Sequence, residues 1–348
     1  SKSLLVTEVD AHHIAEMVRS SLVSEFGQAA YTEGYRVYTS IDSTHQAAAT
    51  RALRHGLLAY DRRHGYRGPA NTLDTARLVD SSYVATALAN ANAPAPLIPA
   101  VVLNVAPDAV SLALADTKKV VLGPSSWRWT KKSIDAVVNP GDLVYVIHSL
   151  NGLLLAQLPE IDGALVSLNP HDGAVLALVG GFDFARNKLN HVTQALRQPG
   201  SNIKPFIYSA ALDNGFSAAS MVSAAPIVIE DTLGNTWKPE NYNKKFFGPT
   251  RLRRALSLSL NLVSVRLTRS LGIPLVTDHL ERFGFSRDRL STGLSLALGS
   301  ASTTPMEIAR GYAVFANGGY LIEPYFIARI ENRDGRIVRY ANHTILCP

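Results

Sequence analysis

Ser201 and Lys204 lie three positions apart, and their types and spacing suit covalent chemistry. Pro199-Gly200 before them favours a tight turn into a helix that ends at Asn214-Gly215, and residues three apart share one helix face. A serine hydroxyl is a weak nucleophile until a base removes its proton. A lysine on the same face can be that base where burial and nearby positive potential lower its pKa. The pair is therefore a candidate nucleophile and general base.

The Ser-x-x-Lys pattern also has a purely structural interpretation. Serine often caps a helix, and a lysine can lay its alkyl chain along the surface while its charge stays in water. A pattern this short arises by chance in a chain of 348 residues. Other segments must decide between the two interpretations.

A Ser-x-Asn triplet occurs three times, at residues 149–151, 167–169 and 259–261. The first two copies end predicted strands, where serine and asparagine serve turns. The third copy, Ser259-Leu260-Asn261, lies between two predicted helices downstream of Ser201. That position suits a second serine in a proton relay and an asparagine amide that holds a substrate backbone.

No other catalytic motif accompanies Ser201. The sequence has no Gly-x-Ser-x-Gly segment, no His-Asp partner pattern, no metal motif and no nucleotide-binding loop. His12 and His13 are adjacent, but a metal site needs three or four converging ligands and no third ligand is near them. Lys204 is therefore the local base, and neither a metal nor a cofactor is expected.

The first part of the chain is predicted to alternate helix and strand. Residues 9–26 form an amphipathic pattern, residues 35–41 are rich in β-branched and aromatic types, and residues 46–60 form a second helical pattern. Residues 70–96 are weakly patterned. Residues 97–160 contain short apolar runs separated by turn residues, which predicts a small β-barrel.

The remainder is predicted to mix helices with a hairpin. Apolar runs at 164–168 and 174–179 flank Asp172-Gly173, which is a strong hairpin signal. These runs barely alternate, so both faces of the hairpin should be covered. Several helices that end at glycines follow.

Composition limits the classes of function. Hydrophobic residues make up 47% of the chain and charged residues 18%, which predicts a folded protein. The net charge is +6, but no basic run or RNA-binding motif concentrates it, so nucleic acid is not expected as a partner. No apolar run reaches the roughly 18 residues of a membrane helix. The single cysteine, Cys347, permits no intrachain disulfide.

Four groups of segments carry a family resemblance: residues 34–42, residues 164–170 with 179–181, residues 197–205 around Ser201, and residues 298–300 with 304–305 and 315–319. Together they resemble class A penicillin-binding proteins of the 1A type, the bifunctional peptidoglycan synthases. The resemblance covers most of the chain. It favours the catalytic interpretation of Ser201 over the structural one.

The resemblance implies an α+β fold of the penicillin-binding transpeptidase and serine β-lactamase-like type, in which helices cover an antiparallel sheet. It adds a small OB-like β-barrel insert. Residues 1–68 would be a linker region that joins a glycosyltransferase to the transpeptidase, residues 69–160 the β-rich insert, and residues 161–348 the N-terminal portion of the transpeptidase domain.

By the same resemblance, Ser201 would attack the carbonyl between the two terminal D-alanines of a stem peptide, and β-lactams would acylate the same serine. Lys204 would be the general base, Ser259 would carry the proton to the leaving amine, and Asn261 would hydrogen-bond the acyl chain. The Ser201 backbone N–H would be half of an oxyanion hole. Trp237 would lie in the site wall, although a core tryptophan is an equal alternative.

The chain departs from the family pattern in one respect. The Lys-Thr-Gly or Lys-Ser-Gly motif is absent, and of the family's five sheet strands we expect only the first two here. We therefore expect a fragment, whose remainder is a second chain or is missing, with the glycosyltransferase and the membrane anchor upstream. The expected location is the periplasmic face of the bacterial inner membrane.

The expected partners are stem peptides ending in D-Ala-D-Ala, β-lactams, a segment carrying the third motif, and an envelope regulator at the insert. Two other functions remain open at this point. One is a catalytically silent scaffold that binds cell-wall partners through the insert. The other is a serine β-lactamase, which shares the Ser-x-x-Lys pattern.

Overall fold

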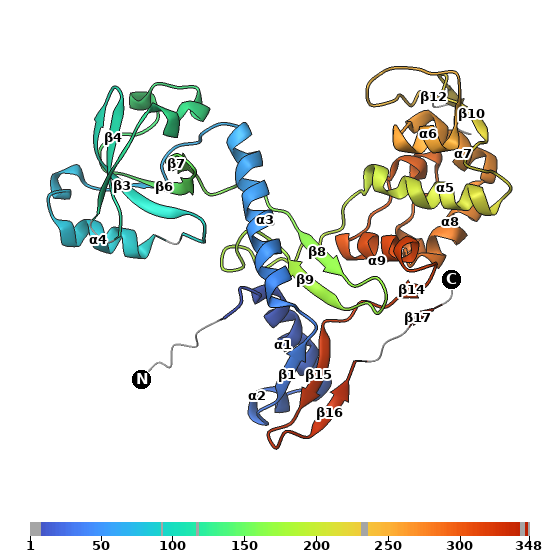
Figure 1. The fold of residues 1–348 in the computed structure, drawn as a ribbon, viewed down its shortest axis with the longest axis horizontal. Helices are drawn as coiled ribbons and strands as arrows, with labels where there is room; N and C mark the ends of the chain where they lie inside the picture. Colours follow the sequence, from blue (N-terminus) through green and yellow to red (C-terminus); the bar gives the residue numbers. More distant parts are fainter. Residues whose placement is uncertain (1–7, 92, 116–117, 231–235, 342–344, 347–348) are drawn as a thin grey trace. The chain divides into compact units, whose positions relative to one another are not determined.

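The computed structural model describes residues 8–91, 93–115, 118–230, 236–341 and 345–346 (Figure 1). Cys347 lies outside the described residues. The chain divides into two compact units: unit 1 holds residues 1–47, 164–180 and 189–348, and unit 2 holds residues 48–163 and 181–188. Within the described residues, none of the helices is both long enough and apolar enough to span a bilayer.

Unit 2 is built on one mixed-length antiparallel sheet. Its strand order is β2-β6-β3-β4-β5, and β7 also pairs with β6. The strands are β2 (Asn71–Thr72), β3 (Ile98–Ala106), β4 (Ala109–Ala113), β5 (Lys119–Leu122), β6 (Asp142–Ser149) and β7 (Gly152–Ala156). The predicted short strands of this region are therefore present.

The sheet of unit 2 is open among the described strands, so the predicted β-rich insert is present but does not close into a barrel. Strand β6 pairs with β3 on one side and with β7 and β2 on the other, while β5 pairs with β4 and no ladder among the described strands closes the sheet. A segment of short 3-10 turns, η2 (Pro124–Ser126), η3 (Arg128–Thr130) and η4 (Ile134–Ala136), covers one apolar face instead. Its Trp127 and Ile134 belong to the same core cluster as Leu112 and Val146. The apolar face is therefore buried although the sheet does not close into a barrel.

Two helices bury other parts of the unit 2 sheet. Helix α4 (Ser81–Asn90) places Val84 and Leu88 against Val101. It begins after Asp80, whose side chain accepts from the N–H groups of Ser82 and Tyr83. The sequence pattern had not indicated this helix. Helix α3 (Ser43–Arg63), of which residues 46–60 were predicted, packs Leu57 and Leu58 in a third apolar cluster.

The N-terminal part of unit 1 pairs strands that are far apart in sequence. Helices α1 (His12–Phe26) and α2 (Ala29–Thr32) precede β1 (Arg36–Thr39), and β1 pairs with β15 (Ile327–Glu331), which pairs with β16 (Ile337–Tyr340). The predicted helix 9–26 and strand 35–41 are confirmed with shorter bounds. The register joins Val37 to Ile330, so the first and last parts of the chain form one sheet.

The predicted hairpin at Asp172-Gly173 is present as β8 (Leu165–Leu168) and β9 (Val175–Val179). Gly173 has φ +83, and a Cβ there would lie 2.4 Å from the carbonyl oxygen of Glu323. Only glycine fits this turn, because other residues would strain the backbone and collide with it. Most of β9 is buried, whereas β8 is half-buried.

The helical part of unit 1 surrounds Phe206. Its elements are η5 (Gly200–Ile203), α5 (Lys204–Asp213), α6 (Leu252–Ser257), α7 (Asn261–Leu271), α8 (Ile273–Arg282), η6 (Arg287–Arg289), η7 (Leu294–Leu298) and α9 (Pro305–Ala316). The Phe206 ring is fully buried and lies 4.9 Å from Phe285 and 5.1 Å from Phe283, both in edge-on geometry. This core fixes the direction of α5, which carries Lys204.

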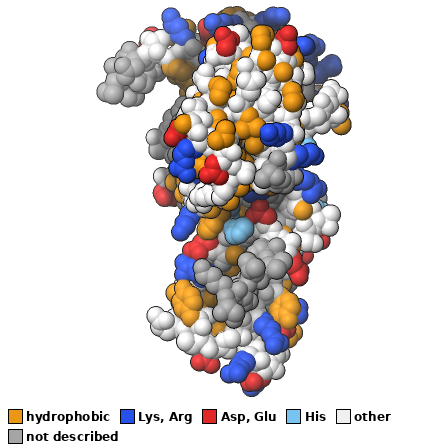
Figure 2. All heavy atoms as spheres, turned by 90° about the vertical axis from the view of Figure 1, so that its left-hand side faces the viewer, with side chains coloured by type: hydrophobic (Ala, Val, Ile, Leu, Met, Phe, Trp, Pro, Cys, Tyr) orange, Lys and Arg blue, Asp and Glu red, His pale blue; other side chains and the backbone are white. Residues whose placement is uncertain are grey.

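Three two-stranded hairpins or ladders complete unit 1: β10 (Met221–Ser223) with β13 (Pro249–Arg251), β11 (Ile229–Glu230) with β12 (Thr236–Trp237), and β14 (Leu321–Ile322) with β17 (Ile345–Leu346). Charges of both signs are interspersed with hydrophobic side chains on the face that Figure 2 shows. The Lys and Arg side chains on that face are not gathered in one band.

Candidate active site

Ser201 lies on an exposed turn that leads into α5. It belongs to η5, and α5 begins at Lys204, one turn later. Gly200 has φ +58 and donates from its N–H to the carbonyl of Gly299 at 3.3 Å. A Cβ on Gly299 would lie 2.0 Å from the Gly200 oxygen. The close approach of two glycine backbones therefore sets the position of the Ser201 turn.

Lys204, by contrast, is buried, and only 1% of its surface is exposed. Its Nζ donates to the Ser259 carbonyl at 2.8 Å, to Ser259 Oγ at 3.0 Å and to Asn261 Oδ1 at 2.6 Å. All three acceptors are neutral. Burial without a neighbouring carboxylate lowers the pKa of Lys204 from its ordinary 10.5 to about 8.

Two of the three acceptors of Lys204 belong to Ser259, in the loop between α6 and α7, and the third belongs to Asn261, the first residue of α7. Ser259 has φ +50, which is unusual for a residue with a Cβ. This left-handed turn brings both its carbonyl and its hydroxyl to Lys204. Because such a conformation costs about 1–3 kcal/mol, the surrounding helices must hold it in place.

A buried asparagine orients the start of α7. Asn241, 4% exposed, accepts at Oδ1 from the N–H groups of Asn261 at 2.9 Å and Leu262 at 3.4 Å, and its Nδ2 donates to the Lys245 carbonyl. The Asn261 Nδ2 donates to the Glu240 carbonyl at 2.8 Å. The amide of Asn261 is therefore fixed with its oxygen toward Lys204.

The segment that precedes Ser201 is held by a second chain segment. Arg197 and Thr303 exchange two backbone hydrogen bonds of 2.9 and 3.1 Å. Glu307 accepts from the Thr303 and Thr304 hydroxyls and the Thr304 N–H, and it pairs with Arg289. Burial opposes ionisation of Glu307, but these donors outweigh it and lower its pKa. The Tyr312 hydroxyl donates to the Asn202 carbonyl at 3.0 Å.

The structure thus brings together three of the five predicted site residues, Lys204, Ser259 and Asn261. Lys204 itself lies one helical turn after Ser201. Within the described residues the Ser201 hydroxyl forms no hydrogen bond. Among the described residues, no hydrogen bond joins Trp237 to this group. It lies in β12 and packs, half-buried, against the core around Phe206.

Sequence reasoning missed Asn241, Glu307 and Tyr312. The Thr304-x-x-Glu307 spacing is a capping box, which is a readable signal of a helix start. Nothing local marks Asn241, because its role arises from a hydrogen bond across 20 positions.

The arrangement can do proton-transfer chemistry at a serine. A lysine ammonium has three donors and no acceptor, and here all three have partners. The neutral amine keeps two donors for the Ser259 carbonyl and the Asn261 oxygen and turns its lone pair toward a hydroxyl. Within the described residues no cluster of His, Cys, Asp and Glu could hold a metal ion.

The buried Lys204 one helical turn after the exposed Ser201 agrees with the families that the chain matches. Residues 163–345 match the penicillin-binding protein transpeptidase domain, and residues 66–161 match the penicillin-binding protein OB-like domain. The chain belongs to the penicillin-binding protein transpeptidase family.

The chain is 43% identical to penicillin-binding protein 1A of Escherichia coli (strain K12), over 97% of the chain and 42% of that protein. It is also 43% identical to penicillin-binding protein 1A of Pseudomonas aeruginosa, over 96% of the chain and 42% of that protein. The expected resemblance to the 1A type is confirmed. The chain spans less than half the length of these relatives.

Solved structures agree with this assignment. The crystal structure of penicillin-binding protein 1A from Haemophilus influenzae superposes with a TM-score of 0.91 at 40% identity and covers 98% of this chain and 51% of that one. PonA1 from Mycobacterium tuberculosis in complex with penicillin V gives a TM-score of 0.56 at 20% identity, covering 94% of this chain and 64% of that one. The second likeness concerns the fold alone.

Proposed function

We propose that this chain carries the D,D-transpeptidase centre of a peptidoglycan synthase and is a target of β-lactam antibiotics. The observation that carries the proposal is Lys204, a buried lysine with neutral partners and a pKa of about 8, one turn after the exposed Ser201. The family membership and the names of the relatives support the same reaction. For the parent protein we propose a glycosyltransferase activity as well, and a location on the periplasmic face of the inner membrane.

In the proposed acylation, Ser201 Oγ attacks the carbonyl of the penultimate D-alanine. Neutral Lys204 takes the serine proton, and the negative charge that develops on the carbonyl oxygen is stabilised by backbone N–H groups, including that of Ser201. The bond to the last D-alanine breaks, and its nitrogen receives a proton. A β-lactam would open its amide at the same serine.

Ser259 is the proposed proton relay, because its hydroxyl lies 3.0 Å from Lys204 Nζ. The proton moves from Lys204 through Ser259 to the leaving amine. Asn261 has one Nδ2 hydrogen on the Glu240 carbonyl, and the other can bind the acyl chain of the substrate. Asn241 is a positioning residue, since it acts through the backbone of Asn261.

The domain division is likewise a proposal. We assign residues 1–68 to the linker region, 69–160 to the OB-like insert and 161–348 to the transpeptidase, and we propose that a Lys-Thr-Gly or Lys-Ser-Gly segment completes the site. Intact mass of the purified sample tests for a fragment that carries this segment.

Labelling with a fluorescent penicillin tests the proposed activity. We expect covalent label on the wild-type protein, no label on Ser201→Ala, and full label on the control Ser270→Ala, since Ser270 is exposed on α7 and is not a proposed site residue. Label that survives Ser201→Ala would contradict the proposal. Absence of wild-type label would favour a silent scaffold, and label lost within seconds by hydrolysis would favour a β-lactamase.

A further inference from the structure

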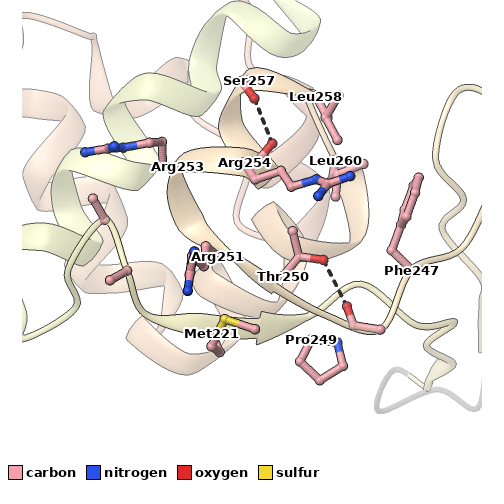
Figure 3. Close-up of a pocket in the computed structure, with 13 residues that line it drawn as sticks. Met221, Phe247, Pro249, Thr250, Arg251, Arg253, Arg254, Ser257, Leu258 and Leu260 are labelled. Carbon is pink, nitrogen blue, oxygen red and sulfur yellow. Dashed lines mark hydrogen bonds between the residues drawn. The ribbon is translucent and has the colours of Figure 1, made fainter.

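A cavity of about 820 Å³ opens beside the Ser259 loop in unit 1 (Figure 3). We name it the arginine pocket. It is lined by Ala218, Ala219, Met221, Phe247, Gly248, Pro249, Thr250, Arg251, Arg253, Arg254, Ser257, Leu258 and Leu260. Leu258 and Leu260 flank Ser259, so the pocket and the Lys204 group share one short loop.

The arginine pocket carries three positive charges, and no acidic side chain is among its lining residues. Arg251, Arg253 and Arg254 are exposed, and none of the thirteen lining residues is acidic. Within the described residues these three arginines form no ion pair. Other arginines of unit 1 do have acidic partners: Arg287 pairs with Asp278 and Glu281, Arg289 with Glu307, and Arg310 with Glu323.

Three neighbouring guanidinium groups repel one another, and a bound anion relieves that repulsion. In Figure 3 Arg254 extends toward Leu260, and Arg253 extends to the opposite side of the view. Arg251 lies between them, near Met221. An anion with more than one negative group could therefore contact Arg251 and Arg254 at separate points.

The other lining residues narrow the class of anion. Met221 is 57% exposed and Leu258 49% exposed, and Phe247 is half-buried. These apolar side chains line the same pocket as the arginines and suit a ligand that carries alkyl groups as well as charges. The volume exceeds what a small inorganic ion fills and lies in the usual range for organic ligands, about 300–1,000 Å³. Arginine also matches the planar fork of a carboxylate.

We propose that the arginine pocket binds a peptide that bears carboxylates, and that this peptide is the amine acceptor of the acyl-enzyme. The second half of the proposal rests on the proposed transpeptidase function. The acceptor amine attacks the ester carbonyl at Ser201, a new amide bond forms as the ester bond breaks, and the proton from the amine returns to Ser201 Oγ. Charge in the pocket holds the acceptor beside the loop that carries Ser259.

A direct binding measurement tests the first half without any activity. The probe is a fluorescein-labelled peptide Ala-Glu-Lys-Ala with free carboxylates, and its match is the same peptide with both carboxylates amidated. By fluorescence anisotropy at low salt we expect the acidic probe to bind about tenfold more tightly. Arg251→Gln and Arg254→Gln should each remove most of that preference, and Arg254→Lys should retain part of it.

Arg269→Gln is the matched control, because Arg269 is exposed on α7 and is not among the pocket residues. Its binding of both probes should equal that of the wild type. The proposed site would be overturned if the wild type bound the two probes with equal affinity. It would also be overturned if Arg269→Gln lost the preference for the acidic probe as fully as the pocket variants. Thermal unfolding of each variant shows that it is folded.

The acceptor role is tested by transfer. With a labelled donor peptide, the KM for the acidic acceptor should rise about tenfold in Arg254→Gln, with the preference over the amidated acceptor lost. A fall in kcat at unchanged KM would overturn the acceptor role. Failure of penicillin to label wild-type Ser201 would defeat the proposed function, whereas the anisotropy result would still decide the pocket.

Discussion

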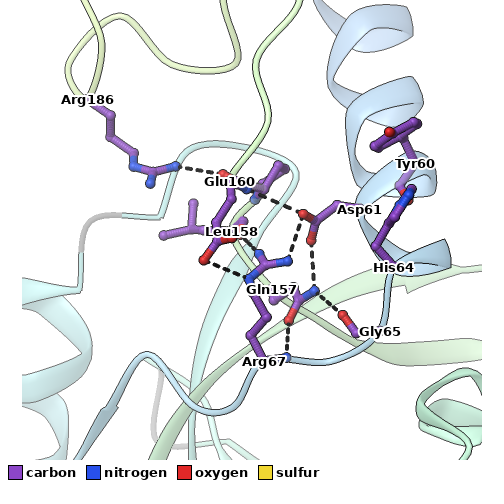
Figure 4. Close-up of polar contacts among 10 residues, drawn as sticks. Tyr60, Asp61, His64, Gly65, Arg67, Gln157, Leu158, Glu160 and Arg186 are labelled. Carbon is purple, nitrogen blue, oxygen red and sulfur yellow. Dashed lines mark hydrogen bonds and ion pairs between the residues drawn. The ribbon is translucent and has the colours of Figure 1, made fainter.

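Lys204 in unit 1 and Asp61 in unit 2 are both charged residues that the fold buries, to 1% and 3% exposure. Their surroundings differ. Asp61 accepts from Arg67 at 2.9 Å and from Gln157 at 2.8 Å, and Arg67 also pairs with Glu160 (Figure 4). Lys204 meets a carbonyl, a hydroxyl and an amide oxygen, all uncharged.

This difference separates a structural charge from a reactive one. Arg67 compensates the charge of Asp61. Gln157 also bonds to the Gly65 carbonyl and the Arg67 N–H. Because Asp61 lies near the end of α3 and Gln157 directly follows β7, this network joins α3 to the end of β7. The partners of Lys204 stabilise its position but do not compensate its charge. The neutral amine is therefore accessible near neutral pH, as a general base requires.

Replacement of Lys204 should produce the largest effect on activity. In Lys204→Met we expect the rate of Ser201 acylation to fall about 10²–10⁴-fold, because the general base is lost. The free energy of unfolding should stay the same or rise, because an uncompensated buried charge is removed. Labelling kinetics measure the acylation rate, and urea unfolding measures the free energy of unfolding. Lys238→Met, at an exposed position, should change neither, and rapid labelling of Lys204→Met would contradict the assignment.

Replacement of Asp61 should lower stability and leave the activity unchanged. In Asp61→Ala we expect the free energy of unfolding to fall by about 2–3 kcal/mol, because Gln157 and Arg67 lose a buried acceptor. Acylation of Ser201 should be unchanged at temperatures where the protein is folded. Asp108→Ala, in the exposed β3–β4 turn, is the control for loss of a carboxylate. A stable Asp61→Ala protein would break the comparison.

Acylation should rise with pH through the pKa of Lys204, about 8. Only the neutral amine accepts a proton, so the rate should increase about tenfold between about pH 7 and 9.

Folding lowers this pKa from 10.5 to about 8, so between these values the unfolded chain binds more protons and stability rises with pH. The wild type should show this rise relative to Lys204→Met in urea unfolding. A rate independent of pH in this range would exclude Lys204 as the base.

Replacement of Asn241 should produce the smallest effect, a shift in the midpoint of the pH–rate profile. Asn241→Asp keeps the acceptor for Asn261 and Leu262 but loses the donor to the Lys245 carbonyl. It adds a negative charge that reaches Lys204 through Asn261, which should raise the pKa of Lys204. We expect the midpoint of the pH–rate profile to move upward by about half a unit, with a few-fold lower rate near pH 7. Asn243→Asp, an exposed neighbour, should leave the midpoint unchanged. A merely structural role for Asn241 would lower the rate without moving the midpoint.

Local patterns predicted much of the secondary structure. The helices at 12–26 and 43–63, the hairpin β8–β9 and the short strands of unit 2 follow from periodicity and turn residues. One helix was missed and one prediction failed, each for a physical reason. The weak pattern of residues 70–96 hid α4, whose start depends on the Asp80 cap. The barrel did not close because the 3-10 segment around Trp127 buries the apolar face.

For the site, the sequence by itself determined the identities and the spacing of Ser201 and Lys204, since residues three apart on one turn need no tertiary contact to be neighbours. Only the tertiary structure decided which Ser-x-Asn copy meets Lys204, that Asn241 orients it, and that Lys204 lacks a counter-charge. It also decided that three arginines share a pocket without acidic partners. These properties depend on burial and on contacts between distant segments, and neither is visible in the order of residues.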